Sequence, residues 1–357
     1  MSQPERRTVP VLSVMDMVPV SAGRSRIDAL TDMIALARAA ADAGYERYWL
    51  AEHHGSTTYL SSATIVLMGQ VLAATERMGV ASGGIMLPNH APLVVAEQIG
   101  TLATLYPGRV DLGLGRAPGT DQRTAAALRR GASDPGRFAE EILEILTYLG
   151  DEPVPERLPG SLLLGASSAS DDALHAPEPG DPRVRAIPGE GTHPTVWVLG
   201  SSVNGARVAG RLGLPFAVAS HFAPVQAEAA IATYRSVLES RAEGAPGPQS
   251  APDVPRVAAA VNVMVAPSQE EARLLFSTAM AAAARIVGNR PGPLDPPSQN
   301  PRAWRAYAPG REGAVEAAMS LSFVGTADDV AARLRELAAR WDLDEILVVT
   351  YAHDPAL

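Results

Sequence analysis

Histidine side chains gather where short apolar runs of this sequence end. Five of the seven histidines follow such runs: His53 and His54 after YWLA, His90 after GGIMLP, His221 after PFAVA and His353 after EILVVT. Imidazole can act as a general acid or base, a hydrogen-bonding group or a metal ligand near neutral pH. A single loop histidine usually has no such role, but a cluster at strand ends predicts a functional site.

The stretch YWLAEHHGST (48–57) places Glu52, His53 and His54 directly after a predicted buried strand. Successive side chains of a strand point to opposite faces. The two histidines therefore cannot both point inward while strand geometry lasts. We expect one to face a ligand and the other to support the loop.

Other apolar runs also end in polar residues. VMDMVP contains Asp16, GGIMLPNH contains His90 and VASHF contains His221. We expect Asp16, His90 and His221 to line a substrate pocket. Metal-dependent hydrolysis is the competing interpretation, but the sequence has no HExxH motif, and Asp16 lies between two methionines rather than beside a histidine pair. We therefore predict no metal site.

Two residue types are missing from the sequence. The absence of cysteine excludes disulfides, thiol nucleophiles and cysteine-bound zinc or iron–sulfur clusters. The absence of lysine excludes Schiff bases, including those of pyridoxal phosphate, and the lysine of phosphate-binding loops. Catalysis must therefore use histidine, acidic, serine or arginine side chains, a metal or a bound cofactor.

Two segments could bind an anion. In DLGLGRAPGTD the glycine spacing is GxGxxxG and Pro118 interrupts the turn, so a dinucleotide-binding motif is disfavoured. Arg116, at the end of the predicted strand, is the better candidate for binding an anion. In VLGSSVNG, Ser201 and Ser202 end a strand just before a predicted helix. Free N–H groups at a helix N-terminus favour phosphate, although serine also caps helices without any ligand.

Gly83 and Gly84 lie side by side within the predicted strand GVASGGI. Glycine weakens the middle of a strand unless the backbone bulges or another group approaches closely. A planar ligand packed on the backbone would explain the pair.

Apolar runs alternate with amphipathic segments along the chain, which predicts a (β/α)₈ TIM barrel. A doubly wound open sheet is the alternative architecture. The active-site face of such a barrel lies at the carboxyl ends of its strands. We predict strands at 11–15, 47–51, 79–85, 110–114, 195–199, 215–219, 258–266 and 345–350, and helices at 26–43, 61–77, 92–106, 122–148, 203–212, 224–242, 268–287 and 327–340.

Two segments interrupt this alternation. Residues 151–193 and 288–315 are rich in proline, glycine and polar residues, and we interpret both as long, partly mobile excursions from one domain that spans 1–357. Seven residues follow the last predicted strand, so the eighth helix of a complete barrel is expected to be missing or truncated.

The charge of the chain limits the classes of partner that it is expected to bind. A net charge of −9 and a pI of about 5.3 argue against nucleic acid and against an anionic membrane surface. No apolar run is long enough to cross a membrane, and the N-terminal stretch has no signal-peptide pattern. We expect a cytoplasmic protein.

The chain resembles the bacterial luciferase-like flavin-dependent monooxygenases. The resemblance covers most of residues 10–225 and the rest more weakly, through RYWLAEHH, GVASGGIMLPNHAPLVVAEQIGTLATLYPGRVDLGLGRAPGTDQ and VWVLGSSVNGARVAGRLGLPFAVASHF. It implies a barrel that binds reduced FMN supplied by a separate flavin reductase. Dioxygen would add to give a 4a-hydroperoxyflavin, which oxygenates a small organic substrate. The closest members include enzymes of natural-product pathways.

The resemblance also implies roles for single residues. His53 matches the active-site histidine of the family, and Glu52 and His54 flank it, so these three are the candidate catalytic residues. Gly83 and Gly84 match a non-prolyl cis peptide beneath the flavin ring. The cofactor's phosphate is expected to bind Arg116, Ser201, Ser202 and the backbone N–H of Gly205, where some members carry a hydroxyl residue.

The resemblance leaves some alternatives open. Some relatives bind a deazaflavin coenzyme and transfer hydride without oxygen, and some subunits bind flavin without catalysing a reaction. Retention of AEHH disfavours the second case. A homodimer is expected because many members are dimers, with the partner or an excursion covering the flank that lacks a helix, and 288–315 is a candidate lid. The sequence does not identify the substrate.

Overall fold

The computed structural model describes residues 10–117, 119–128, 135–150, 185–241 and 256–357, which form a (β/α)₈ TIM barrel, as predicted. All its neighbouring strands are parallel, and the last strand closes the ring by pairing with the first and with the seventh. The eight strands are β1 (Val11–Asp16), β2 (Arg47–Leu50), β3 (Gly79–Ser82), β5 (Val110–Gly115), β6 (Thr195–Gly200), β7 (Phe216–Val218), β8 (Val257–Val265) and β10 (Glu345–Val349).

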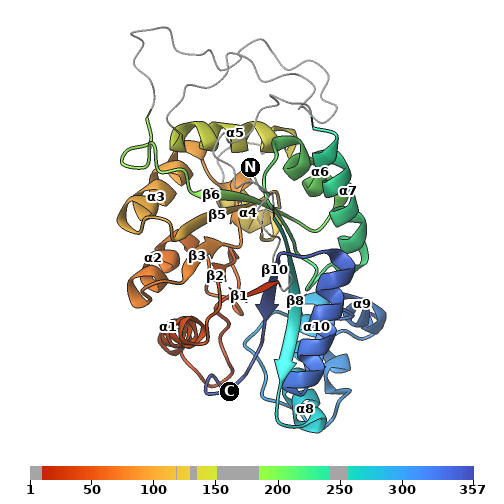
Figure 1. Ribbon diagram of the computed structural model, residues 1–357. Helices are drawn as coiled ribbons and strands as arrows, with labels where there is room; N and C mark the ends of the chain where they lie inside the picture. Colours follow the sequence, from red (N-terminus) through yellow and green to blue (C-terminus); the bar gives the residue numbers. More distant parts are fainter. Residues whose placement is uncertain (1–9, 118, 129–134, 151–184, 242–255) are drawn as a thin grey trace, which may run out of the picture.

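Helices surround the barrel, and their apolar sides cover the strands. Figure 1 shows α1 to α3 along one side and α6 and α7 along the opposite side. The helices are α1 (Arg26–Asp42), α2 (Thr64–Ala74), α3 (Pro92–Leu105), α4 (Gln122–Leu128), α5 (Phe138–Leu149), α6 (Val203–Leu212), α7 (Ala227–Glu239), α8 (Gln269–Val287), α9 (Glu312–Ala318) and α10 (Ala327–Trp341). Residues 350–357, which follow β10, form no helix.

The barrel interior is filled by side chains from alternate strand positions. Met15, Trp49, Ala81, Trp197 and Leu347 belong to one buried cluster inside the ring. The two tryptophan rings meet edge to face with centroids 5.3 Å apart, an arrangement that aromatic quadrupoles favour. This layer closes the floor beneath the carboxyl ends of the strands.

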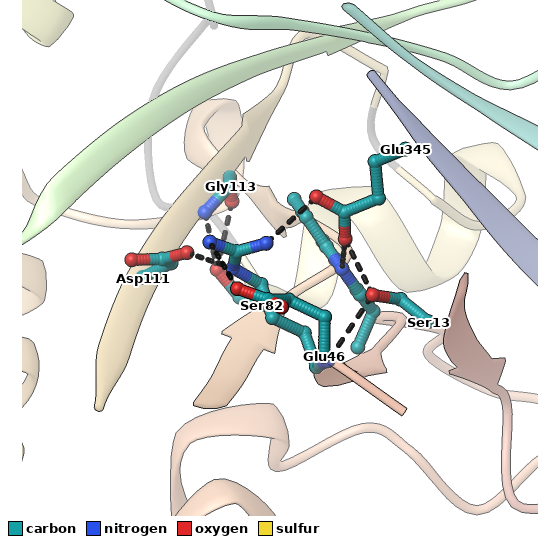
Figure 2. Close-up of polar contacts among 8 residues, drawn as sticks. Ser13, Glu46, Ser82, Asp111, Gly113 and Glu345 are labelled. Carbon is teal, nitrogen blue, oxygen red and sulfur yellow. Dashed lines mark hydrogen bonds and ion pairs between the residues drawn. The ribbon is translucent and has the colours of Figure 1, made fainter. Parts of the chain in front are cut away.

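A buried ionic network closes the amino-terminal end of the barrel (Figure 2). Arg47 donates to Asp111 at 2.5 Å and to Glu345 at 2.7 Å. Glu345, which is fully buried, also accepts from Ser13 and from the indole of Trp49. Burial raises the pKa of Glu345, although the charge of Arg47 opposes that effect. The network ties β1, β2, β5 and β10 together far from the active-site face.

Two predicted elements are divided in the structure. The strand expected at 79–85 stops at Ser82 and resumes as β4 (Ile85–Met86), which pairs with β5. The helix expected at 122–148 is replaced by α4, a 3₁₀ turn (Pro135–Arg137) and α5. Proline removes a helical N–H donor and glycine weakens a helix, which explains a break at the Pro-Gly pair.

The excursion at 288–315 is tied to the barrel by hydrogen bonds, and its expected partial mobility stays a prediction. Leu294 exchanges backbone hydrogen bonds with Val20 and Ala22 in the loop after β1, and Thr58 donates to Gly292. The segment also carries a 3₁₀ helix (Ala303–Tyr307) and α9, which pack on α8. Most of the other predicted excursion, 151–193, lies outside the described residues.

A further short strand, β9 (Ser322–Gly325), pairs with β8 outside the closed ring. Among the described residues, no helix is both long and apolar enough to cross a membrane.

Candidate functional site

A cavity of about 430 Å³ opens at the carboxyl ends of the strands. Ligand sites of this size are common in proteins, and this end of a TIM barrel is where its active sites lie. Of the residues predicted for a site, the following line the cavity: His53, Gly83, Gly84, Arg116, Ser201, Ser202, Gly205 and His221. The other four, Glu52, His54, Asp16 and His90, lie behind its wall.

The alternation of side chains after β2 separates the three residues of the EHH stretch. His53 faces the cavity, in line with the inward-facing Trp49 and Ala51. Glu52 and His54 point the other way and bind each other, with His54 Nε2 at 2.8 Å from Glu52 Oε1. One histidine therefore faces the cavity while the other supports the loop.

Glu52 links the loop after β2 to the segment at the end of β4, behind the cavity wall. His54 and His90 lie 2.8 and 2.9 Å from the same carboxylate oxygen, and the N–H of Met86 donates to the other oxygen at 3.3 Å. Burial alone would raise the pKa of Glu52, but the hydrogen bonds and charges of His90 and His54 outweigh it and hold that pKa below its usual value. His90 is thus a support for Glu52, which corrects its assignment to the substrate pocket.

The same three side chains present their ligand-type atoms within 4.8 Å of one another, a spacing that could suit a metal. The two nitrogen–oxygen distances are those of hydrogen bonds. Hydrogen bonding to one buried carboxylate accounts for the cluster without an ion.

Asp16 also lies outside the cavity, which corrects the second pocket assignment. Its side chain accepts from the hydroxyl of Tyr48 at 2.6 Å and from the N–H of Val18 at 2.8 Å. Val18 has a φ of 53°, which a β-branched residue rarely adopts. Asp16 therefore shapes the strained turn after β1, while its neighbours Met15 and Met17 line the cavity.

One end of the cavity suits a phosphate. Arg116 follows β5, and Ser201 and Ser202 follow the adjacent strand β6, which pairs with it at Gly115 and Leu199. Ser202 is the N-cap residue of α6, but its side chain makes no capping hydrogen bond, so ordinary helix capping, the alternative to a phosphate site, does not account for this serine. A guanidinium, two serine hydroxyls without a partner among the described residues, and a helix N-terminus therefore face the same space, and this donor set fits a phosphate group.

Gly83 and Gly84 form part of the cavity wall, and the peptide bond between them is cis, as the resemblance implied. A Cβ atom on Gly84 would lie 2.7 Å from the carbonyl oxygen of Gly113. The backbone at Gly84, just before β4, thus approaches β5 more closely than any side chain would allow.

Two uncharged imidazoles face the cavity. Burial lowers the pKa of His53 to about 4, against the opposing charge of Glu52, and burial lowers the pKa of His221 to about 3, with a protonated His53 disfavouring a second charge. The Nδ1 atoms of both rings are buried without a hydrogen-bond partner. Both side chains are therefore neutral near pH 7 and have hydrogen-bonding capacity that the described part of the protein leaves unused.

Sequence reasoning missed the apolar and aromatic part of the wall. The two-residue period of β1 and β10 could have identified Met15 and Leu347 as inward-facing. The aromatic residues that follow the strands lie outside strand geometry, so no period indicates where they point. The missed residues are Met15, Met17, Tyr59, Met86, Leu199, Phe222, Ile286, Leu347 and Tyr351.

Fold and site together define a TIM-barrel protein whose cavity can take a phosphate-bearing cofactor. A family model described as luciferase-like monooxygenase matches residues 12–343. The chain belongs to the luciferase-like monooxygenase family.

Individual relatives agree with this assignment. A luciferase-like monooxygenase of Escherichia coli (strain K12) is 40% identical over 337 residues, which cover 94% of this chain and 90% of the relative. Among solved structures, apo-MsnO8 shares 30% identity with a TM-score of 0.77, covering 98% of this chain and 95% of that one. The oxygenating constituent of 3,6-diketocamphane monooxygenase from Pseudomonas putida, solved with FMN, has the same fold at 18% identity and a TM-score of 0.65, covering 97% and 94%.

Proposed function

We propose that this protein is an FMN-dependent monooxygenase, which uses reduced FMN and dioxygen to oxygenate a small organic substrate. One observation carries the proposal: the same cavity contains a donor set suited to phosphate, at Arg116 and α6, and a neutral imidazole, that of His53, elsewhere on its wall. Family membership and the FMN-bound neighbour support the choice of cofactor.

Each part of the site has a task in this proposal. Arg116 and Ser202 would hold the phosphate, and the side-chain-free wall at Gly83 and Gly84 would accommodate the flat ring system. The bound cofactor supplies the electrons and the dioxygen chemistry. The apolar walls exclude water, which limits wasteful release of hydrogen peroxide. His53, neutral at working pH, can accept or return a proton at Nε2 as the substrate reacts.

The proposal includes a separate flavin reductase and a homodimer. The Pseudomonas putida neighbour is the oxygenating constituent of its monooxygenase, and the same division of labour would suit this chain. Added reductase and reduced nicotinamide should then support substrate oxygenation by the purified protein, whereas nicotinamide alone should not.

The test is anaerobic binding of oxidised FMN, reduced FMN and a deazaflavin coenzyme, followed by rapid mixing with oxygenated buffer. We expect reduced FMN to bind most tightly and to give a long-lived absorbance change distinct from that of oxidised FMN. Preference for the deazaflavin, without reaction with oxygen, would overturn the proposal in favour of hydride transfer.

A variant sharpens the cofactor test. Arg116→Met removes a charge-assisted hydrogen bond, which is expected to weaken FMN binding by roughly 10- to 100-fold. Riboflavin, which lacks the phosphate, should bind the variant and the parent protein equally. Equal loss for both ligands would show that Arg116 does not recognise the phosphate.

A further inference from the structure

The charge of the cavity restricts what can enter it. Among the described residues of its wall, Arg116 is the single permanently charged side chain, and the proposed function assigns it to the cofactor's phosphate. The remaining wall is apolar or uncharged, with Met17, Leu347 and Ile286 among its members. A carboxylate or ammonium group on the substrate would be buried there without a counter-charge, which is strongly unfavourable.

Aromatic rings concentrate in this wall although the chain is poor in them. Tyr59, Tyr351 and Phe222 all line the cavity. The ring of His53 lies 5.1 Å from that of Tyr59, and the rings of Tyr59 and Tyr351 are 6.2 Å apart. Rings at these separations offer faces and edges to another flat molecule.

His221 is fixed in place but lacks a polar partner. It is 8% exposed, and its carbonyl accepts from Asn262 at 2.6 Å, while the ring of Phe222 meets it edge-on at 4.8 Å. No hydrogen bond joins either imidazole nitrogen to another described residue, and Nδ1 is shielded from solvent. Because Nδ1 is closed off, a ligand in the cavity would bond to the ring at Nε2, which also has no partner among the described residues.

We propose that the substrate is an uncharged aromatic compound that bears a hydroxyl group, and that this hydroxyl donates a hydrogen bond to the neutral imidazole of His221. The inference rests on the proposed function, because it assumes that the phosphate occupies Arg116. The apolar and aromatic wall holds the ring system, and the single hydrogen bond sets its orientation.

A packing role for His221 is the competing explanation, since its ring also fills space beside Phe222. The variant His221→Phe keeps an aromatic ring of similar shape and removes only the nitrogens. It therefore separates packing from hydrogen bonding.

The experiment measures binding of three matched probes to the FMN-loaded protein by equilibrium dialysis at pH 7.5: 2-naphthol, naphthalene and 2-naphthoate. We expect 2-naphthol to bind about five- to tenfold more tightly than naphthalene, the ratio that one hydrogen bond supplies, and 2-naphthoate to bind at least about 100-fold more weakly than 2-naphthol. In His221→Phe the preference for 2-naphthol over naphthalene should disappear while naphthalene affinity stays within about twofold.

His353→Phe is the control, because His353 lies outside the cavity and its Nε2 contacts the carbonyl of Ala22. It should retain the full preference for 2-naphthol. Tight binding of 2-naphthoate, or an undiminished preference in His221→Phe, would overturn the inference. Flavin binding is measured first and separately, so failure to bind FMN would count against the proposed function, and the effect of His221→Phe would then be measured on the flavin-free protein.

Discussion

At the scale of single residues, the two-residue period of the strands decides which side chains meet the cavity. This period predicted that His53 and His54 would point in opposite directions. In the structure His53 faces the cavity, whereas His54 faces away from it and binds Glu52. The same period, applied to β1, would have placed Asp16 outside and Met15 and Met17 inside, but the argument from residue chemistry favoured the carboxylate. A residue's chemistry indicates what it could do, whereas its position in the strand decides where it points.

The buried neutral state of His53 predicts how stability changes with pH. The folded pKa of about 4 lies below the usual 6.5, so the unfolded chain binds a proton between these values and the folded protein does not. The His53 contribution to the free energy of unfolding is therefore complete above pH 6.5 and declines as the pH falls toward 4.

His53→Gln, which cannot titrate, measures this effect. Relative to the variant, the parent protein should lose about 2–3 kcal/mol of stability between pH 7 and pH 4.5, at about 1.4 kcal/mol per pKa unit. Urea unfolding at the two pH values provides the comparison. A difference between the proteins that does not change with pH would mean that His53 is protonated freely in the folded state.

Gly83 and Gly84 should respond differently to alanine. A Cβ on Gly84 meets the backbone of Gly113 at 2.7 Å, whereas a Cβ on Gly83 meets the flexible tip of Met15 at 2.7 Å. Gly84→Ala should therefore lower stability by about 1–3 kcal/mol and Gly83→Ala by clearly less, because a methionine tip can move. Thermal unfolding of the two variants provides the measurement, and equal losses would contradict the close approach of β4 to β5.

At the scale of elements, the sequence predicted the eight barrel strands and most of the helices between them, because apolar runs and amphipathic segments differ in period. The prediction failed where a short interruption divides an element that has a continuous sequence pattern. Residues 79–85 have a continuous strand pattern, yet the chain turns at Gly83 and Gly84 to place β4 against β5.

The ionic network at the amino-terminal end of the strands predicts a large effect from one substitution. Arg47→Met leaves the fully buried Glu345 without its cation, which should cost about 3–5 kcal/mol. The double variant Arg47→Met with Glu345→Gln should recover part of this loss, because the fully buried charge of Glu345 is removed, although the partly buried Asp111 still lacks its cation. Urea unfolding of both variants measures the difference.

Arg24→Met is the matched control for that experiment. Arg24 pairs with Asp32 at 2.7 Å, but both side chains are about one-third exposed. Exposed pairs contribute at most about 1 kcal/mol, so this variant should unfold close to the parent protein. A similar loss for Arg24→Met and Arg47→Met would show that burial of Glu345 does not determine the cost.

At the scale of the whole molecule, the cavity combines residues that are distant in the chain. His53 comes from the loop after β2, Arg116 follows β5, Ser202 follows β6 and Tyr351 follows β10. That His53, Arg116 and Ser202 would lie near one another could be predicted, because the carboxyl ends of all barrel strands lie on one face. The grouping of Tyr59, Tyr351 and Phe222 could not, because no local pattern links three aromatic residues that only the closed barrel brings together.

An apolar face on α1 and α2 supports the proposal of a homodimer. Ile27 is 71% exposed and Val66 is 66% exposed, and Leu30, Ile34 and Leu67 line a groove between the two helices. Exposed apolar side chains beside an apolar groove are typical of a contact with another protein. Val66→Arg should therefore convert a dimer to a monomer in gel filtration with light scattering.

Val225→Arg is the control for self-association. Val225 is 84% exposed and precedes α7, which lies across the barrel from α2 (Figure 1). This variant should keep the oligomeric state of the parent protein. A parent protein that is a monomer at all concentrations would rule out the homodimer.

The pairing of β10 with both β1 and β8 sets the order in which the molecule can mature. A ribosome makes the amino-terminal strands first, but the ring stays open until Glu345–Val349 has emerged. The serines beside α6 are synthesised long before Tyr351, which completes the wall. A nascent protein halted before residue 345 would already contain His53, Arg116 and Ser202, but it would lack Leu347, Tyr351 and the strand that closes the ring around the cavity.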